Sequence, residues 1–212
     1  MIVDSLHKSW LQLAEAYFKT TSESSFCWQK IQKNYSSKSR YYHNLIHIQS
    51  MLKKASENKN RITNYDELLF AIWFHDIVYK ATSKKNEAKS ADFAKSALKT
   101  ISRDRLDINS IHKLIISTKK HQIILKENTD NAFLLDFDLA ILGADWKVYE
   151  TYIQNIRREY KIYPDLIYKP ARKKVLLHFL DREKLYFTDT YQQLYEERAR
   201  KNIKKEIQKY LK

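Results

Sequence analysis

Hydrophobic residues recur three and four positions apart along most of the chain, the spacing that places them on one face of an α-helix. This spacing predicts a series of helices, of which the first covers residues 4–19 and the last covers residues 188–211. The segment 67–79, ELLFAIWFHDIVY, differs, because every residue after its first is apolar or aromatic except His75 and Asp76. It is too continuous for a surface helix and too short to cross a membrane, which takes about 20 apolar residues. We therefore predict a helix buried at the centre of a domain.

The adjacent His75 and Asp76 need a physical reason to lie in such a helix. Burying a carboxylate is costly unless it is paired or bound to a metal. Metal binding supplies one reason, because imidazole and carboxylate together suit a divalent ion. The alternative is a buried hydrogen bond between the two side chains that only orients the helix.

Two further histidines occur in the segment 40–52, RYYHNLIHIQSML. His43 and His47 are four positions apart, so on a helix they lie on one face, one above the other. They can serve one metal centre together, or one can bind metal while the other handles protons. The alternative is a pair of partly exposed histidines with neither role.

Two aspartates, Asp136 and Asp138, interrupt the apolar helix predicted over 128–143, which ends at the only glycine of the chain. They are about 200° apart on a helix, so they cannot both point at one place. Asp138 has large aliphatic residues three and four positions away on both sides, whereas Asp136 has alanines four positions away. We expect Asp138 to point inward and Asp136 to be less deeply set.

Other ionisable residues occur in two predicted helices between these segments. A helix over about 86–102 places Glu87 in its first turn, where a carboxylate favours the helix dipole. A helix over 107–121 places His112 and His121 about half a turn out of phase. Only one of the two can then face a shared site.

Composition supports helices joined by short polar loops. The chain has 212 residues with one Gly, two Pro and one Cys, which excludes Gly-rich phosphate loops and an intramolecular disulfide and argues against an all-β fold. We expect an all-α, single-domain bundle over 1–212, with a core at about 40–143 and C-terminal helices over 145–212 packed on it. The beginning of the chain lacks the pattern of a secretory signal, so we expect a cytoplasmic protein with no membrane partner.

The formal net charge of +14 favours anionic partners, such as phosphorylated small molecules or nucleic acid. The lysines are spread along the chain rather than clustered, however. The alternative is therefore that they only make exposed helix faces soluble.

The order His47, His75-Asp76, Asp138 in an all-helical chain resembles the HD superfamily of metal-dependent phosphohydrolases, which bind a divalent metal through the pattern H…HD…D. The stretch YYHNLIH resembles the Y-H-N-x-x-H motif of cyclic-nucleotide phosphodiesterases, which are distant members of that superfamily, and FDLAIL resembles the segment with their last metal aspartate. The chain looks most like a bacterial group of HD phosphohydrolases of unassigned substrate, through RYYHNLIHIQSML, FHDIVY, NEAKSA, DFDLAILG and EERARKNI.

This resemblance implies a metal site and a proton donor. The ligands would be His47, His75, Asp76 and Asp138, holding Mn, Fe, Ni, Co, Zn or Mg with water in the remaining positions. By resemblance to Y-H-N-x-x-H, His43 would protonate the leaving oxygen while His47 binds the metal.

The function implied is hydrolysis of a phosphate ester or anhydride of a nucleotide or another small phosphorylated molecule by metal-activated water. Glu87 would position or deprotonate that water, and Arg40, Lys119 and His121 are the candidates for holding the substrate phosphate. One alternative is a non-catalytic helical protein that binds a nucleotide or nucleic acid, which the positive charge favours. Another is a di-metal HD oxygenase, which would need further histidine ligands that His112 and His121 are poorly phased to supply together.

Overall fold

The fold is known from a computed structural model that describes residues 2–99, 101, 106–126 and 129–211. Every regular element in these residues is a helix, which confirms the predicted all-α class. The chain divides into two compact units, 1–134 and 135–212. The expectation of one domain over 1–212, with its core at about 40–143, stays a prediction. The expected helix ends at 102 and 128 lie outside the described residues.

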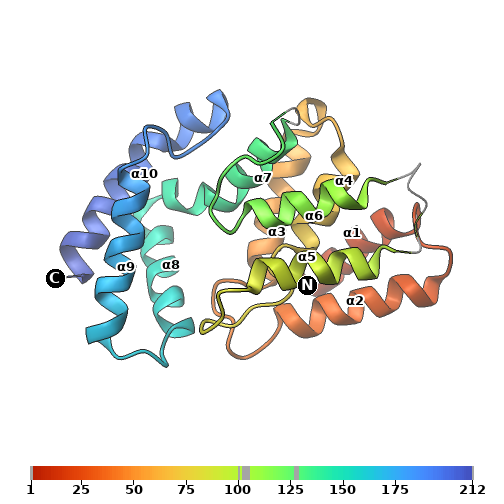
Figure 1. The fold of residues 1–212 in the computed structure, drawn as a ribbon, viewed down its shortest axis with the longest axis horizontal. Coiled ribbons are helices and arrows are strands. Elements are labelled where there is room, and N and C mark those ends of the chain that lie inside the picture. Colours follow the sequence, from red (N-terminus) through yellow and green to blue (C-terminus); the bar gives the residue numbers. More distant parts are fainter. Residues whose placement is uncertain (1, 100, 102–105, 127–128, 212) are drawn as a thin grey trace. The chain divides into compact units, whose positions relative to one another are not determined.

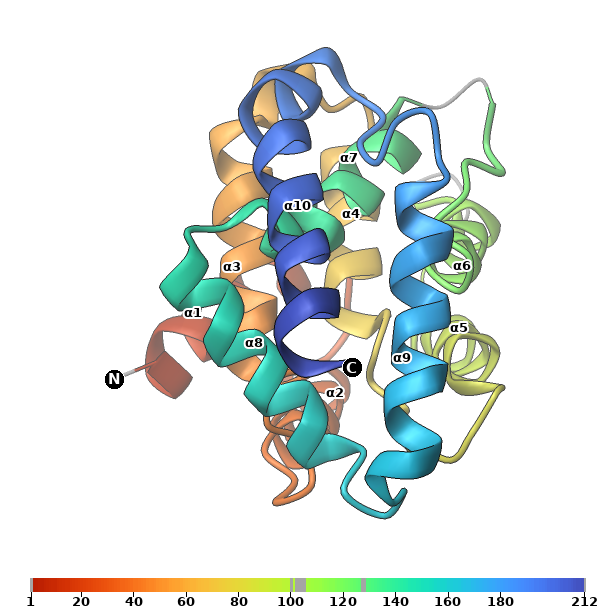
Figure 2. The ribbon, with the colours of Figure 1, turned by 90° about the vertical axis from the view of Figure 1, so that its left-hand side faces the viewer.

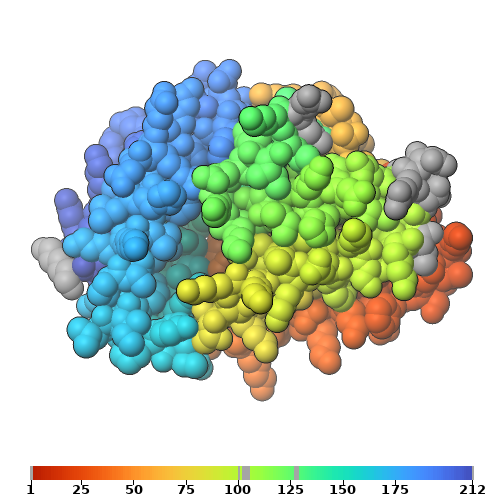
Figure 3. Space-filling model, in the orientation of Figure 1, coloured from red at the N-terminus to blue at the C-terminus, as the bar shows by residue number. Residues whose placement is uncertain are grey.

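The first unit is built around α4 (Tyr65–Phe74), the helix that the apolar run predicted. It packs against α3, α5 and α6, and Figures 1 and 3 show α5 and α6 side by side on one face of the unit. The elements of this unit are α1 (Ile2–Ala14), α2 (Thr21–Tyr35), α3 (Leu45–Glu57), η1 (Lys59–Arg61), α4, α5 (Asn86–Ala97), α6 (Ile108–Ser117) and the first half of α7 (Asp130–Leu139).

The predicted burial of α4 is confirmed, because six of its ten residues are buried. Trp10 of α1 contacts the rings of Phe70, Trp73 and Phe74 edge-on, with centroids 5.8–6.0 Å apart. Edge-to-face aromatic pairs at such distances add to the hydrophobic stabilisation of a core. The contacts of these aromatic residues with Trp10 therefore position α4 against α1.

The end of α4 differs from the prediction, because the helix stops at Phe74 and not at Tyr79. His75 is the C-cap residue, and the Asp76 N–H donates to the Tyr35 hydroxyl at 3.2 Å. The carbonyl oxygens of Asp76 and Ile77 accept hydrogen bonds from Arg40. The helix ends here because partners distant in sequence take over the backbone groups that a further turn would have used.

The beginning of α3 also differs from the prediction, which had placed His43 within the helix. Asn44 is the N-cap residue, and its side-chain oxygen accepts from the Ile46 N–H at 2.9 Å. His43 therefore precedes α3, whereas His47 lies in its first turn. The two imidazoles do not lie one above the other on one helix face.

The second unit contains the last part of α7, η2 (Ala140–Gly143), α8 (Trp146–Glu159), α9 (Asp165–Leu180) and α10 (Asp189–Tyr210). Figures 1 and 2 show α10 running beside both α8 and α9. Gly143 ends η2, and its φ is not positive, so the left-handed conformation common for glycine after a helix is not used here. A Cβ atom here would lie 2.6 Å from Cβ and 2.9 Å from the carbonyl oxygen of Tyr195, so glycine is required by this close approach to α10.

A buried polar network joins the helices of the second unit. Glu206 of α10 is fully buried and accepts hydrogen bonds from Arg172 of α9 and from the hydroxyl of Tyr149 of α8. Arg172 also donates to the Tyr152 hydroxyl. These groups hold the three helices together, so Arg172 has a structural role. Across the described residues, no helix is both long enough and apolar enough to cross a membrane.

Candidate metal centre

Three of the predicted ligands come together in the first unit. His47, His75 and Asp76 each offer a ligand atom, and these atoms all lie within 4.8 Å of one another. The Nε2 atoms of the two histidines are 3.2 Å apart, and His75 Nε2 lies 3.3 Å from Asp76 Oδ2. His47 is supplied by the first turn of α3, and the other two residues come from the end of α4. The contact between these helices therefore assembles the group.

A hydrogen bond to the backbone fixes the orientation of the His75 ring. Its Nδ1 lies 2.8 Å from the carbonyl oxygen of Ile72, one turn earlier in the chain. A carbonyl can only accept, so Nδ1 carries a proton, and in the neutral imidazole Nε2 then presents its lone pair to the group. This arrangement is the one that metal-binding histidines ordinarily show.

The separations within the group fit a bound metal ion. Two atoms at about 2.1 Å from one ion lie about 3.0 Å apart at a right angle and about 3.4 Å apart at the tetrahedral angle. Two of the three separations, 3.2 Å between the histidines and 3.3 Å between His75 and Asp76, fall in that interval, and the third pair of atoms lies within 4.8 Å. Two imidazoles and a carboxylate form a mixed nitrogen and oxygen donor set that suits Mn, Fe, Co, Ni or Zn and leaves room for water.

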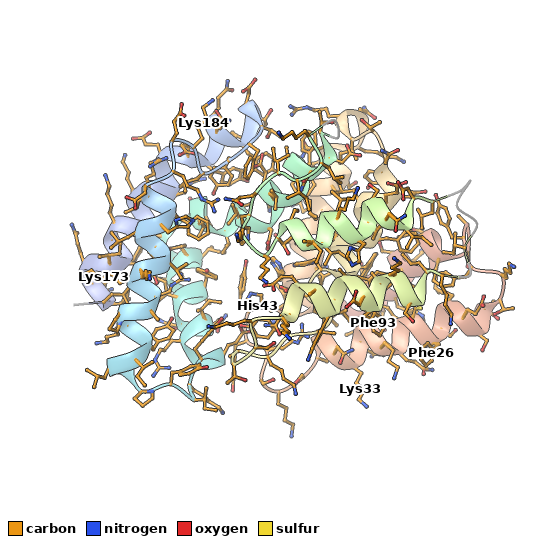
Figure 4. All side chains as sticks on the ribbon, viewed as in Figure 1. Phe26, Lys33, His43, Phe93, Lys173 and Lys184 are labelled. Atoms are coloured by element: carbon orange, nitrogen blue, oxygen red, sulfur yellow. The ribbon has the colours of Figure 1, made fainter. Side chains whose placement is uncertain are left out.

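His43 lies beside this group without joining it (labelled in Figure 4). Its Nε2 is 3.9 Å from Asp76 Oδ2, and its ring stacks on Tyr79 with centroids 4.3 Å apart. The side chain is 20% exposed, whereas that of His75 is 1% exposed. His43 is therefore accessible to solvent, and the ring stack fixes the plane of the imidazole.

Asp138, the fourth predicted ligand, belongs to the second unit, and its place in the metal site stays a prediction. The expected burial of the two aspartates was wrong, since Asp136 is fully buried and Asp138 only half-buried. Asp136 accepts from the N–H groups of Phe187 and Thr188 and from the Thr188 hydroxyl, at 2.7–2.8 Å. Thr188 is the N-cap of α10, so Asp136 anchors the beginning of that helix. These partners are about 50 residues away along the chain, so the sequence could not show them.

The remaining predicted residues lie in the first unit outside the three-residue group. Glu87 is half-buried in the first turn of α5, as expected. Lys119 and His121 lie in the turn after α6, which ends at Ser117 rather than at residue 121. His121 has a φ of 46°, the left-handed conformation, so the turn fixes its backbone. Their roles at the water and the phosphate stay predictions.

Arg40 is 8% exposed, and its guanidinium binds backbone carbonyl oxygens in the segments that carry His43 and Asp76. Sequence reasoning selected Arg40 for substrate phosphate, and that role stays a prediction. Sequence reasoning did not identify Tyr35 and Tyr79, whose rings lie on the guanidinium of Arg40. Tyr79 follows Asp76 by three residues, a local signal, whereas Tyr35 is 41 residues away and gave none.

Comparison of the chain with protein-family models, with curated proteins and with solved structures found no match.

Proposed function

We propose that this protein is a metal-dependent phosphohydrolase of the HD type. The observation that supports the proposal is the buried group of His47, His75 and Asp76, with ligand-atom separations that suit one divalent ion. A satisfied histidine–aspartate pair would explain two of these side chains. It would leave unexplained why a third, His47, directs its Nε2 at the same point from another helix.

The three residues would hold the ion, and Asp138 would complete the ligand set. When bound, a divalent ion polarises a phosphoryl oxygen and lowers the pKa of a coordinated water molecule. The reaction adds the oxygen of water to phosphorus and breaks the bond between phosphorus and the leaving oxygen. His43 would donate the proton that the leaving oxygen takes up, and Glu87 would accept the proton of the attacking water.

The proposed substrate is a small phosphate ester or anhydride, with nucleotides as the first class to test. The net charge of +14 supports an anionic substrate. The partly exposed edge of the site, where Asp76 and the neighbouring His43 reach the surface, would provide access for it. The ion would neutralise part of the phosphate charge next to the buried histidines.

The test is a screen of the Mn²⁺-loaded protein against nucleotides and phosphate esters, with release of phosphate or nucleoside as the readout. We expect turnover by the wild type, none by Asp76→Asn, and wild-type turnover by Asp92→Asn, a control carboxylate that is 75% exposed. Equal activity in Asp76→Asn and Asp92→Asn would refute the proposal. So would saturable binding of a nucleotide or nucleic acid with no product formed and no loss of binding in Asp76→Asn, which is the outcome expected of a non-catalytic binder.

A further inference from the structure

Arg40 joins the two segments that carry the candidate catalytic and metal-binding residues. One guanidinium nitrogen, Nη1, donates to the carbonyl oxygen of His43 at 3.1 Å and to that of Asp76 at 2.6 Å. The other, Nη2, donates to the carbonyl oxygen of Ile77 at 2.9 Å. A single side chain thus holds the backbone before α3 against the backbone after α4.

Two tyrosines hold the guanidinium in this place. Its central carbon lies 4.8 Å from the ring centroid of Tyr35 and 5.5 Å from that of Tyr79. A cation over an aromatic face gains attraction that strengthens when water is excluded. Both tyrosines have a second contact at the site, because the Tyr35 hydroxyl accepts from the Asp76 N–H and the Tyr79 ring stacks on His43.

The end of α4 explains why an arginine is needed. The carbonyl groups of Asp76 and Ile77 lie just beyond the last residue of α4, and burying such groups without a hydrogen-bond donor is costly. The planar, forked guanidinium can donate to several carbonyls in fixed directions, whereas the ammonium of lysine is a compact point charge.

From these contacts we propose that Arg40 is a positioning residue, which sets Asp76 and His43 in register with His47 and His75. This inference rests on the proposed function, because it assigns the clamp to assembly of the metal site. It replaces the expectation that Arg40 binds the substrate phosphate. The guanidinium is buried and donates to three main-chain carbonyl oxygens, so it would have to break these hydrogen bonds in order to reach a phosphate.

The test compares Arg40→Lys and Arg40→Ala with the wild type, and uses Arg158→Lys, an exposed arginine of the second unit, as the control. The first measurement is amide hydrogen exchange on metal-free protein. Exchange should accelerate in segments 41–47 and 75–79 of both Arg40 variants and stay unchanged in α6. This readout does not depend on whether the protein binds metal.

The second measurement is the affinity for Mn²⁺ by calorimetry. Both Arg40 variants should bind Mn²⁺ at least tenfold more weakly than the wild type, and millimolar methylguanidinium should restore part of the affinity of Arg40→Ala by filling the vacated space between the tyrosine rings. Arg158→Lys should match the wild type in both measurements.

Two outcomes would overturn the inference. One is unchanged hydrogen exchange in the Arg40 variants. The other is unchanged Mn²⁺ affinity combined with a raised KM for a phosphate substrate, which would identify Arg40 as a phosphate ligand. A wild type that takes up no Mn²⁺ would instead refute the proposed function, and the exchange measurement would still decide whether Arg40 clamps the two segments.

Discussion

Replacing His43 by alanine separates proton donation from metal binding. His43 lies outside the three-residue group, 3.9 Å from Asp76 Oδ2, so its removal should leave the metal ligands in place. The side chain is 20% exposed and stacks on Tyr79. Loss of that stack should cost about 1 kcal/mol, which is small against the 5–15 kcal/mol that ordinarily stabilises a domain. We therefore expect a folded variant that keeps its metal.

The expected loss of rate follows from the chemistry of the leaving group. A positioned general acid contributes about 10²–10⁴-fold, or about 2.7–5.4 kcal/mol of activation free energy, when the leaving oxygen is strongly basic. A nitrophenolate leaves with little protonation, so the contribution should be much smaller on an activated ester. Turnover of a nitrophenyl phosphate diester and of an alkyl phosphate diester by the same His43→Ala protein measures this difference.

The control for this experiment is His112→Ala. His112 is another partly exposed histidine, at 31%, and it pairs with the surface residue Asp92 rather than with the metal group. It should keep full rate on both substrates. Loss of metal from His43→Ala, or an equal loss of rate on both classes of leaving group, would contradict the division of roles between His43 and His47.

Three further predictions concern the scaffold. Arg172→Met should reduce the free energy of unfolding by about 3–5 kcal/mol, because Glu206 would stay buried without its cation. Adding Glu206→Leu should recover most of this loss, and additive losses in the double-mutant cycle would contradict the prediction. Burial raises the pKa of Cys27 to about 11, so the thiol of the native protein should react far more slowly with Ellman's reagent at pH 8 than the thiol of the unfolded chain, and equal reactivity would contradict this prediction. For the same reason the free energy of unfolding should fall as the pH rises from about 9 towards 11. Gly143→Ala should cost about 1–3 kcal/mol in denaturant unfolding because its Cβ overlaps Tyr195, and an unchanged midpoint would contradict that overlap.

For the first unit, the sequence predicted which segments are helical more accurately than it predicted where each helix begins and ends. The apolar run of α4 correctly indicated a buried helix, because burial depends on local composition and that run has no polar face. The end of α4 depends on Tyr35 and Arg40, which are 41 and 36–37 residues away along the chain. No local pattern carries that information. The N-cap at Asn44, in contrast, had a usable signal, since asparagine before an apolar run favours a helix start.

The aspartates of α7 show the same limit for the candidate site. Helical periodicity correctly separated Asp136 from Asp138 by direction, but it could not say which one is buried. Asp136 is buried because the loop before α10, about 50 residues later, supplies three hydrogen-bond donors. Burial of a carboxylate depends on such partners rather than on the size of its helix neighbours.

The central claim is that His47, His75 and Asp76 bind a divalent ion, and metal content tests it most directly. Asp76→Ala is the informative variant, because the hydrogen bonds of Tyr35 and Arg40 to the backbone of Asp76 do not need its carboxylate and should keep the end of α4 folded. After loading with Mn²⁺ and desalting, elemental analysis should find about one ion per chain in the wild type and in the surface control Asp92→Ala, and almost none in Asp76→Ala, with unchanged circular dichroism. Equal metal content in the wild type and in Asp76→Ala would contradict the claim.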